Sequence, residues 1–263
     1  MPWVLRGLRE GVVTTGWPRR PDAYADGWIG GVDVLPGAAD PAAERLCPTG
    51  AIGGDADGGL ALDRGRCILC GACVRARPDL FAWAAGAQTA RLSREALVVP
   101  APDDTDEAAV ERMRAELAAR VRSLHRSVHI RHVDTGSDGS EEWEVHALLN
   151  PVYDVGRLGI FFTASPRHAD ILLVTGAGGH GMAGPLRRTL EAMPAPTVVI
   201  AAGTDAISGG LTAPTYAVAG GVGGLVPVDV WVPGSPPSPF SLLHAILLAL
   251  GRVGPHRPER GSP

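Results

Sequence analysis

The sequence predicts an α/β protein in two parts: a small α+β domain, then a larger domain with a doubly wound parallel sheet. Three observations carry this prediction. All four cysteines lie between positions 47 and 73, in a stretch rich in Gly and Pro. After residue 129, short apolar segments alternate with helical ones, which is the pattern of a parallel sheet. The chain has 263 residues, a length that suits one large or two small domains.

Hydrophobic residues make up 45% of the chain, enough for packed cores, and the formal net charge of −4 gives no electrostatic argument for nucleic acid binding. The first residues lack the apolar stretch and cleavage site of a signal peptide. The longest apolar run, near residues 240–250, is too short to cross a membrane. Four cysteines in so long a chain do not suggest a secreted disulfide framework. We therefore expect a cytoplasmic protein with no transmembrane segment of its own.

The expected order is an N-terminal arm (1–30), the small domain (31–100), a connecting helix (101–128), the large domain (129–252) and a polar tail (253–263). Trp and Arg residues recur along the arm. The arm could therefore lie on a partner or a membrane surface, or it could be a solvated tail. Within the connecting segment, Asp104 and Glu107 have capping-box spacing. Apolar side chains follow them at helical spacing, so a helix is predicted over about 104–126.

Five strands and three helices are predicted in the large domain. The strands are expected at 129–134, 159–164, 170–176, 197–203 and 226–234, and the helices at 141–150, 184–193 and 239–250. Several strand segments are apolar at every position, which is typical of strands buried on both faces. The helix over 184–193 would carry Pro185 in its first turn, where the missing N–H costs nothing.

Cys67, Cys70 and Cys73 follow one another at two-residue spacing, and Cys47 precedes Pro48. Three thiolates so spaced can bind three irons of a cubane, and the fourth iron needs a remote cysteine, for which Cys47 is the one left. A zinc site is the competing interpretation, although such sites usually use two pairs of ligands. A [3Fe–4S] form or a lost cluster would also agree with the spacing. The motif predicts one [4Fe–4S] cluster on these four residues, and a protein that passes electrons.

Residues 34–81 resemble two-cluster ferredoxins, in which the cysteine before proline in each run serves the other run's cluster. The resemblance implies ligands of a second cluster near Gly37, Asp40 and Ala43, and a final cysteine at Arg77, before Pro78. None of these residues is a cysteine. One cluster thus has none of its expected ligands, whereas the other has all four.

The N-terminal half, with LREGVVTTGWPRRPD ahead of the cysteines, resembles the ferredoxin-type (23 kDa-like) subunit of complex I and of membrane-bound group 4 [NiFe]-hydrogenases such as formate hydrogenlyase. Residues 129–250 resemble the 20 kDa-like small subunit of the same complexes. The matching stretches are ALLNPVYDVGRLGI, ASPRHADILLVTG, PLRRTLEAMPAPTVVIAAG and VPVDVWVPGSPPSP. The resemblance implies a natural fusion of two adjacent subunits, with a flavodoxin-like second domain.

This resemblance implies an electron-transfer subunit of a complex I-like or hydrogenase-like oxidoreductase, with no complete active site of its own. Its partners would be a hydrogenase-like or complex I-like large subunit and membrane subunits, on the inner face of the cell membrane. The alternative is a structural or coupling subunit whose cluster only stabilises the fold.

The small subunit that this half resembles has its own cluster, whose ligands would fall at Asp138, Glu141, Asp205 and Ser235. No cysteine follows residue 73, so thiolates cannot hold a cluster in this half. Carboxylates are poor ligands for iron–sulfur clusters. The four residues would either hold a hard cation such as Mg²⁺ or Ca²⁺, or line a pocket filled by water and hydrogen bonds.

The segment Gly176–Gly181 matches G-x-G-x-x-G, between a predicted strand and a predicted helix, and Asp205 follows the next strand. A nucleotide-binding oxidoreductase is therefore a third hypothesis, although the resembled subunit has a small-residue loop here without a nucleotide. His168 and His180 are the other chemically capable residues in this half, and a structural role is expected for His168.

Overall fold

The computed structural model describes residues 3–36, 40–55, 58–100, 127–212 and 214–253, together with residues 112, 115, 116 and 119. The helix predicted over 104–126 lies almost entirely outside these residues, as does the tail beyond residue 253. Within the described ranges, no helix is long and apolar enough to cross a membrane.

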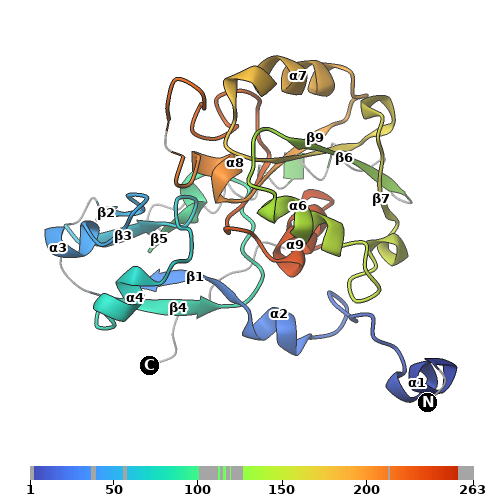
Figure 1. The fold of residues 1–263 in the computed structure, drawn as a ribbon, viewed down its shortest axis with the longest axis horizontal. Helices are drawn as coiled ribbons and strands as arrows, with labels where there is room; N and C mark the ends of the chain where they lie inside the picture. Colours follow the sequence, from blue (N-terminus) through green and yellow to red (C-terminus); the bar gives the residue numbers. More distant parts are fainter. Residues whose placement is uncertain are drawn as a thin grey trace.

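A five-stranded sheet forms the centre of the second half (Figure 1). Its strands are β6 (Val128–Asp134), β7 (Ile160–Phe162), β8 (Ile171–Thr175), β9 (Val198–Ala202) and β10 (Val230–Val232). All neighbours are parallel, in the order β10-β9-β8-β6-β7. Numbered from β6, this is the 2-1-3-4-5 order of flavodoxin-like folds. The predicted parallel sheet is confirmed, and β8 and β9 are buried at every residue.

Helices cover both faces of this sheet. On one face, α6 (Ser140–Ala147) and α9 (Pro239–Ala249) share an apolar core with β6, β8 and β9. On the other face, α7 (His180–Glu191) and α8 (Thr204–Ser208) pack on the same strands. Two predictions change here. The helix α7 begins at His180, so Pro185 lies inside it and not in its first turn. The strand β10 is three residues long, much shorter than predicted.

The first half is α+β. Strands β1 (Ile29–Val34) and β4 (Phe81–Ala85) pair antiparallel. A second antiparallel sheet contains β2 (Ile52–Gly54), β3 (Leu60–Asp63) and β5 (Val98–Val99). Two short helices, α3 (Pro41–Glu44) and α4 (Ala72–Ala76), complete it. These elements share one core, to which Cys67 and Cys73 belong.

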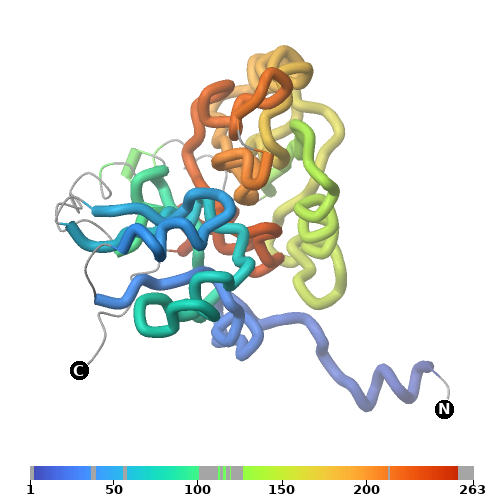
Figure 2. Tube along the Cα trace, turned by 60° about the vertical axis from the view of Figure 1, so that its left-hand side comes forward, coloured from blue at the N-terminus to red at the C-terminus, as the bar shows by residue number. Residues whose placement is uncertain are grey.

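The predicted N-terminal arm divides into two stretches of different character. Helix α1 (Trp3–Glu10) has no buried residue and lies apart from the rest of the molecule in both views (Figures 1 and 2). The following stretch, which includes α2 (Ala23–Gly27), packs onto the second half. The Thr15 amide donates to the Val152 carbonyl at 2.8 Å. The Trp17 ring meets Phe240 edge-on, with 6.1 Å between ring centroids.

Residues 87–92 also bind the two halves together. Ala87, Ala90 and Leu92 are buried in the core that contains α9. Arg91 and Trp231 exchange two backbone hydrogen bonds of 2.9 and 2.8 Å. Helix α9 is therefore covered by the sheet on one side and by N-terminal residues on the other, which explains why each of its residues is buried.

Candidate functional site

The four cysteines line one small, largely apolar pocket in the first half, together with Val32 and Leu62. Cys67 and Cys73 are buried, Cys47 is half-buried and Cys70 is exposed. The structure therefore brings together all four residues that the sequence singled out. Because Cys70 lies at the surface, the pocket is open to a partner on that side.

The loop between β3 and α4, which carries Cys67 and Cys70 (the cysteine loop), curves around this pocket because two of its residues have positive φ. Leu69 has φ of 55° and Gly71 of 68°, so the chain turns sharply between Cys67 and Cys73. A β-carbon on Gly71 would lie 2.6 Å from the Trp83 ring, which leaves room for glycine alone. Helix α4 then begins at Ala72 and presents Cys73 to the pocket.

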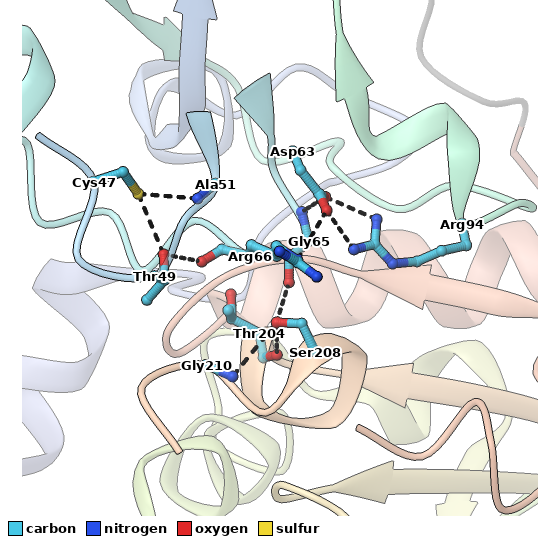
Figure 3. Close-up of polar contacts among 10 residues, drawn as sticks. All are labelled: Cys47, Thr49, Ala51, Asp63, Gly65, Arg66, Arg94, Thr204, Ser208 and Gly210. Atoms are coloured by element: carbon cyan, nitrogen blue, oxygen red, sulfur yellow. Dashed lines mark hydrogen bonds and ion pairs between the residues drawn. The ribbon is translucent and has the colours of Figure 1, made fainter. Parts of the chain in front are cut away.

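Backbone amides point at the sulfurs. The Ala51 amide donates to the Cys47 Sγ at 3.2 Å, and the Thr49 hydroxyl lies 3.3 Å from the same sulfur (Figure 3). Burial raises the pKa of Cys67 to about 11, against the opposing effect of the Leu69 amide. Burial likewise raises the pKa of Cys73. A metal group that enters this pocket would have to displace protons from these thiols.

Among the described residues, no three His, Cys, Asp or Glu side chains lie close enough together to hold a single metal ion. A tetrahedral zinc site needs thiolates within roughly 4 Å of one another, since each Zn–S bond is about 2.3 Å. In a four-iron cluster each cysteine thiolate binds a different iron, so the cysteine sulfurs lie farther apart than in a zinc site.

An ion pair and an alanine occupy positions where the ferredoxin resemblance implied further ligands. Asp40 accepts the Ala42 amide at 2.8 Å and also pairs with the Arg77 guanidinium. The same guanidinium pairs with Asp79 and holds the pKa of both carboxyl groups below its usual range. Ala43 is fully buried in the core, and Gly37 lies outside the described residues.

In the second half, the structure places Asp138, Glu141 and Asp205 within electrostatic reach of one another. Glu141 is 1% exposed, and burial together with the Asp205 and Asp138 carboxylates raises its pKa to about 7. Burial also raises the pKa of Asp205. The pKa of Asp138 is lowered by hydrogen bonds from Ser140, whose amide donates at 2.9 Å. Ser235 is exposed, beside the Gly234 carbonyl that accepts the Thr204 amide.

Helix α8, which carries Asp205, contacts the loop that precedes Cys67, and Figure 3 shows Ser208 of this helix beside Gly65 of that loop. The Thr204 hydroxyl donates to the Cys67 carbonyl at 3.0 Å, and the Ser208 hydroxyl donates to the Gly65 carbonyl at 2.9 Å. Asp63 holds the same loop, because it accepts the Gly65 amide and pairs with Arg94. The sequence analysis missed Thr204 and Ser208, since nothing in their local sequence shows what they contact across the fold.

A second polar cluster that sequence reasoning missed lies at the carboxyl edge of the parallel sheet. His132 Nε2 lies 3.0 Å from the Thr175 hydroxyl and 3.6 Å from the Glu142 carboxylate. Glu142 also accepts hydrogen bonds from Thr175 and, at 2.6 Å, from Ser137. Burial lowers the pKa of His132 although Glu142 opposes it. We expect a neutral imidazole here at neutral pH.

In the glycine-rich segment Gly176–Gly181, the backbone amides donate hydrogen bonds to other groups of the protein. The amides of residues 177–180 donate to the Gly136 carbonyl, the Thr135 hydroxyl, the Thr135 carbonyl and the Ala217 carbonyl, at 2.7–3.2 Å. A β-carbon on Gly176 would lie 2.7 Å from the Gly136 backbone, so this glycine serves close packing. A phosphate could bind only by breaking these bonds, which counts against the nucleotide hypothesis. His168 and His180 are exposed.

The family model described as "NADH ubiquinone oxidoreductase, 20 Kd subunit" matches residues 139–249. The chain is 40% identical over 158 residues to formate hydrogenlyase subunit 7 of Escherichia coli, a match covering 60% of each chain. It is 35% identical over 157 residues to the probable membrane-bound hydrogenase subunit mbhJ of Pyrococcus furiosus, covering 58% of this chain and 94% of that one.

The match to an NADH-quinone oxidoreductase subunit of Rhizobium meliloti is 44% identical over 111 residues, covering 42% of this chain and 66% of the relative. A solved chain of an archaeal membrane-bound sulfane sulfur reductase is 28% identical, covers 50% of this chain, and superposes with a TM-score of 0.44. The chain thus spans less than two thirds of some of these relatives and nearly all of the Pyrococcus one. Its second half carries the family match, and the chain belongs to the family of the 20 kDa subunit of NADH:ubiquinone oxidoreductase.

Proposed function

We propose that this chain is an electron-transfer subunit of a membrane-associated complex I-like or hydrogenase-like oxidoreductase, with one [4Fe–4S] cluster on Cys47, Cys67, Cys70 and Cys73. The observation that carries the proposal is the convergence of these four residues on one pocket. The kind of group that they would hold follows from their spacing in the sequence, since three thiolates two residues apart and a remote fourth suit four irons.

The first half supports a one-cluster chain derived from a two-cluster ferredoxin. The Asp40–Arg77 ion pair joins two positions where the ferredoxin family would have ligands of its other cluster. An ion pair at these positions can hold the backbone together without iron. With no cysteine after residue 73, the second half would add no cluster of its own.

The relatives support a place among partner subunits. Their names describe subunits of formate hydrogenlyase, of a membrane-bound hydrogenase and of NADH-quinone oxidoreductase. We infer that this chain lies on the cytoplasmic face of the membrane, beside a hydrogenase-like or complex I-like large subunit and membrane subunits. The exposed edge at Cys70 is the side on which a redox partner would approach.

When bound, the cluster would supply one-electron oxidation and reduction. The protein's contribution lies in its own groups. The Ala51 and Leu69 amides direct N–H groups at sulfur, which favours the thiolate and tunes the potential. Val32 and Leu62 keep water from the inner side of the pocket. Thr204 fixes the position of the Cys67 backbone from the second half.

The test is anaerobic purification or reconstitution of the full chain, with iron and sulfide analysis and EPR spectroscopy before and after chemical reduction. We expect about four irons and four sulfides per chain, as a cubane requires, and a signal that appears on reduction. Cys67→Ser should lose this content. Asp138→Asn, at a ligand position of the resembled small subunit, should keep it. One zinc ion per chain and no sulfide would refute the proposal.

A structural role for the cluster is the second candidate, favoured by the hydrogen bonds that bind the cysteine loop to α8. A cluster at this place would stabilise the contact between the two halves as well as transfer electrons. The same samples separate the two roles. A bound cluster that no low-potential reductant reduces, but whose removal lowers the melting temperature, would assign it to structure.

A further inference from the structure

A cavity of about 420 Å³ lies outside the cysteine pocket, where α2 meets the segment that follows β4 (Figure 1). It is lined by Trp17, Ala25, Asp26 and residues 85–88, and we call it the α2 cavity. Most of these residues are alanine or glycine, so few side-chain atoms enter the space. The electron transfer proposed above makes no use of this cavity.

Contacts between distant segments hold the walls of the α2 cavity in place. The Ala87 amide donates to the Ala25 carbonyl at 2.9 Å, which joins the segment after β4 to α2. Trp17 is buried, with its ring edge-on to Phe240, and its carbonyl accepts a hydrogen bond of 2.6 Å from the Arg157 guanidinium. The cavity is therefore formed before a ligand arrives, which lowers the entropic cost of binding.

The polar groups of the lining are acceptors suited to a cation. Asp26 is the one charged residue that lines the cavity within the described part of the chain. Neither its carboxylate nor the Gln88 side-chain amide has a hydrogen-bond partner among the described residues. Trp17 adds an indole ring, which attracts cations to its face. A carboxylate, an amide oxygen and an aromatic ring together suit a guanidinium group, which is planar and has several N–H donors.

Exposed apolar side chains lie within three residues of Asp26 in the chain. Tyr24 is 80% exposed, Trp28 41% and Ile29 46%. Exposed Tyr and Trp residues beside an unpaired acid are typical of surfaces that bind another protein, where such aromatic residues provide much of the affinity. A small free cation would gain nothing from these side chains, whereas a polypeptide could cover them.

We propose that the α2 cavity receives an arginine side chain of a partner protein. The Asp26 carboxylate and the Gln88 amide oxygen accept hydrogen bonds from the guanidinium, and the residues beside that arginine cover Tyr24 and Trp28. The cavity shares no lining residue with the cysteine pocket, so this inference does not depend on the cluster. A partner bound here would contact the N-terminal stretch and the first half at once.

The direct test is a titration of the full chain with the peptide acetyl-Gly-Leu-Arg-Leu-Gly-amide, followed through the tryptophan indole N–H signals in a nitrogen-15 NMR spectrum. Trp17→Phe identifies the Trp17 signal. We expect this signal to shift and saturate as the peptide is added. The same peptide with citrulline in place of arginine keeps the shape without the charge. It should bind about tenfold more weakly or worse, as expected for the loss of a charged hydrogen bond.

Two variants locate the site. Asp26→Asn should weaken the arginine peptide about tenfold and leave the citrulline peptide unaffected. Asp26 is exposed, so this change should not alter the melting temperature. Glu191→Gln removes an exposed acid from the end of α7 and should bind both peptides as the unmodified chain does. If Asp26→Asn fails to fold, the comparison of the two peptides on the unmodified chain still decides the matter.

The possible failures can be told apart. A Trp17 signal that does not move overturns the inference, and so does equal binding of the two peptides, because the charge is then not recognised. Agmatine, a small guanidinium compound, should bind more weakly than the peptide. Equal binding would make this a site for small cations and overturn the partner protein. A chain that binds the arginine peptide but forms no cluster overturns the proposed function alone.

Discussion

Thr204 joins the two halves of the molecule through a single hydroxyl group. It is fully buried, donates to the Cys67 carbonyl at 3.0 Å, and lies 3.4 Å from the Gly234 amide, which donates to it. A buried carbonyl that loses its donor retains the cost of its desolvation. This residue therefore affects both the stability of the fold and the position of the Cys67 backbone.

We expect Thr204→Val to lower the free energy of unfolding by about 1–3 kcal/mol, because the side chain keeps its shape while a buried carbonyl loses its partner. Thermal unfolding of the full chain measures the change. Thr197→Val is the control, since its hydroxyl donates to the nearby Pro194 carbonyl in an exposed hydrogen bond. Equal melting temperatures for the two variants would contradict the importance of the contact.

Glu141 predicts a pH dependence of stability. Its pKa rises from 4.5 to about 7 on folding, so the folded state binds the proton more tightly than the unfolded state. The stabilisation that results is complete below about pH 4.5 and is lost as the pH rises towards 7, roughly 3 kcal/mol in all. Melting temperatures of Glu141→Gln, relative to the unmodified chain, should rise between about pH 4.5 and 7 and level off above that range. A constant difference would show that this carboxyl group has an ordinary pKa in the fold.

For single residues, the sequence could predict a site whose members follow a regular spacing. Cys67, Cys70 and Cys73, with Cys47 before a proline, could be assigned to one site without knowledge of the fold. His132, Glu142 and Thr175 carry no such signal, because three separate elements bring them together at the sheet edge. The Glu141–Gly203 contact is likewise a product of the tertiary structure.

Helix α9 is the element on which both halves depend. All its residues are buried, and its core includes strands of the sheet as well as Trp17, Ala90 and Leu92. Its continuous apolar run was visible in the sequence, and so were the apolar strands β8 and β9. Helix α8 was not predicted, because five residues that follow a strand show no helical periodicity.

We expect Leu243→Ala in α9 to cost about 2–5 kcal/mol, because it opens a cavity where the side chain is fully buried. Leu149→Ala removes the same atoms from a site that is 55% exposed and should change stability little. Chemical denaturation of both variants under the same conditions measures the difference. Two similar losses would mean that α9 is not packed as the structure describes.

At the scale of the whole molecule, the structure is one body with a single projecting helix. Thr15 and Trp17 attach the start of the chain to the second half, residues 87–92 do so again, and α8 contacts the cysteine loop. The sequence indicated two domains and a separate arm. It could not show how they meet, since contacts between distant segments leave no periodic pattern.

Removal of residues 1–12, which include α1, should leave the melting temperature and the iron content expected from the proposed cluster unchanged, because no residue of this helix is buried. Trp17→Ala should cost about 3–5 kcal/mol, because a buried indole ring leaves a large cavity. Calorimetry and iron analysis of the two variants provide the check. A truncated chain that loses stability would show that α1 packs against the body.

The burial of α9 also bears on how the protein is made. The ribosome synthesises Ala90 and Leu92 roughly 160 residues before the end of α9, at about 5–20 residues per second. For roughly ten to thirty seconds, Ala90 and Leu92 therefore lack the helix that they pack against in the finished fold. Factors that deliver iron and sulfide can reach the cysteine loop during this interval, before α8 closes over the Cys67 backbone. Insertion of the proposed cluster and synthesis of α9 would then compete in time, and slower translation of the codons before α9 should favour the loaded protein.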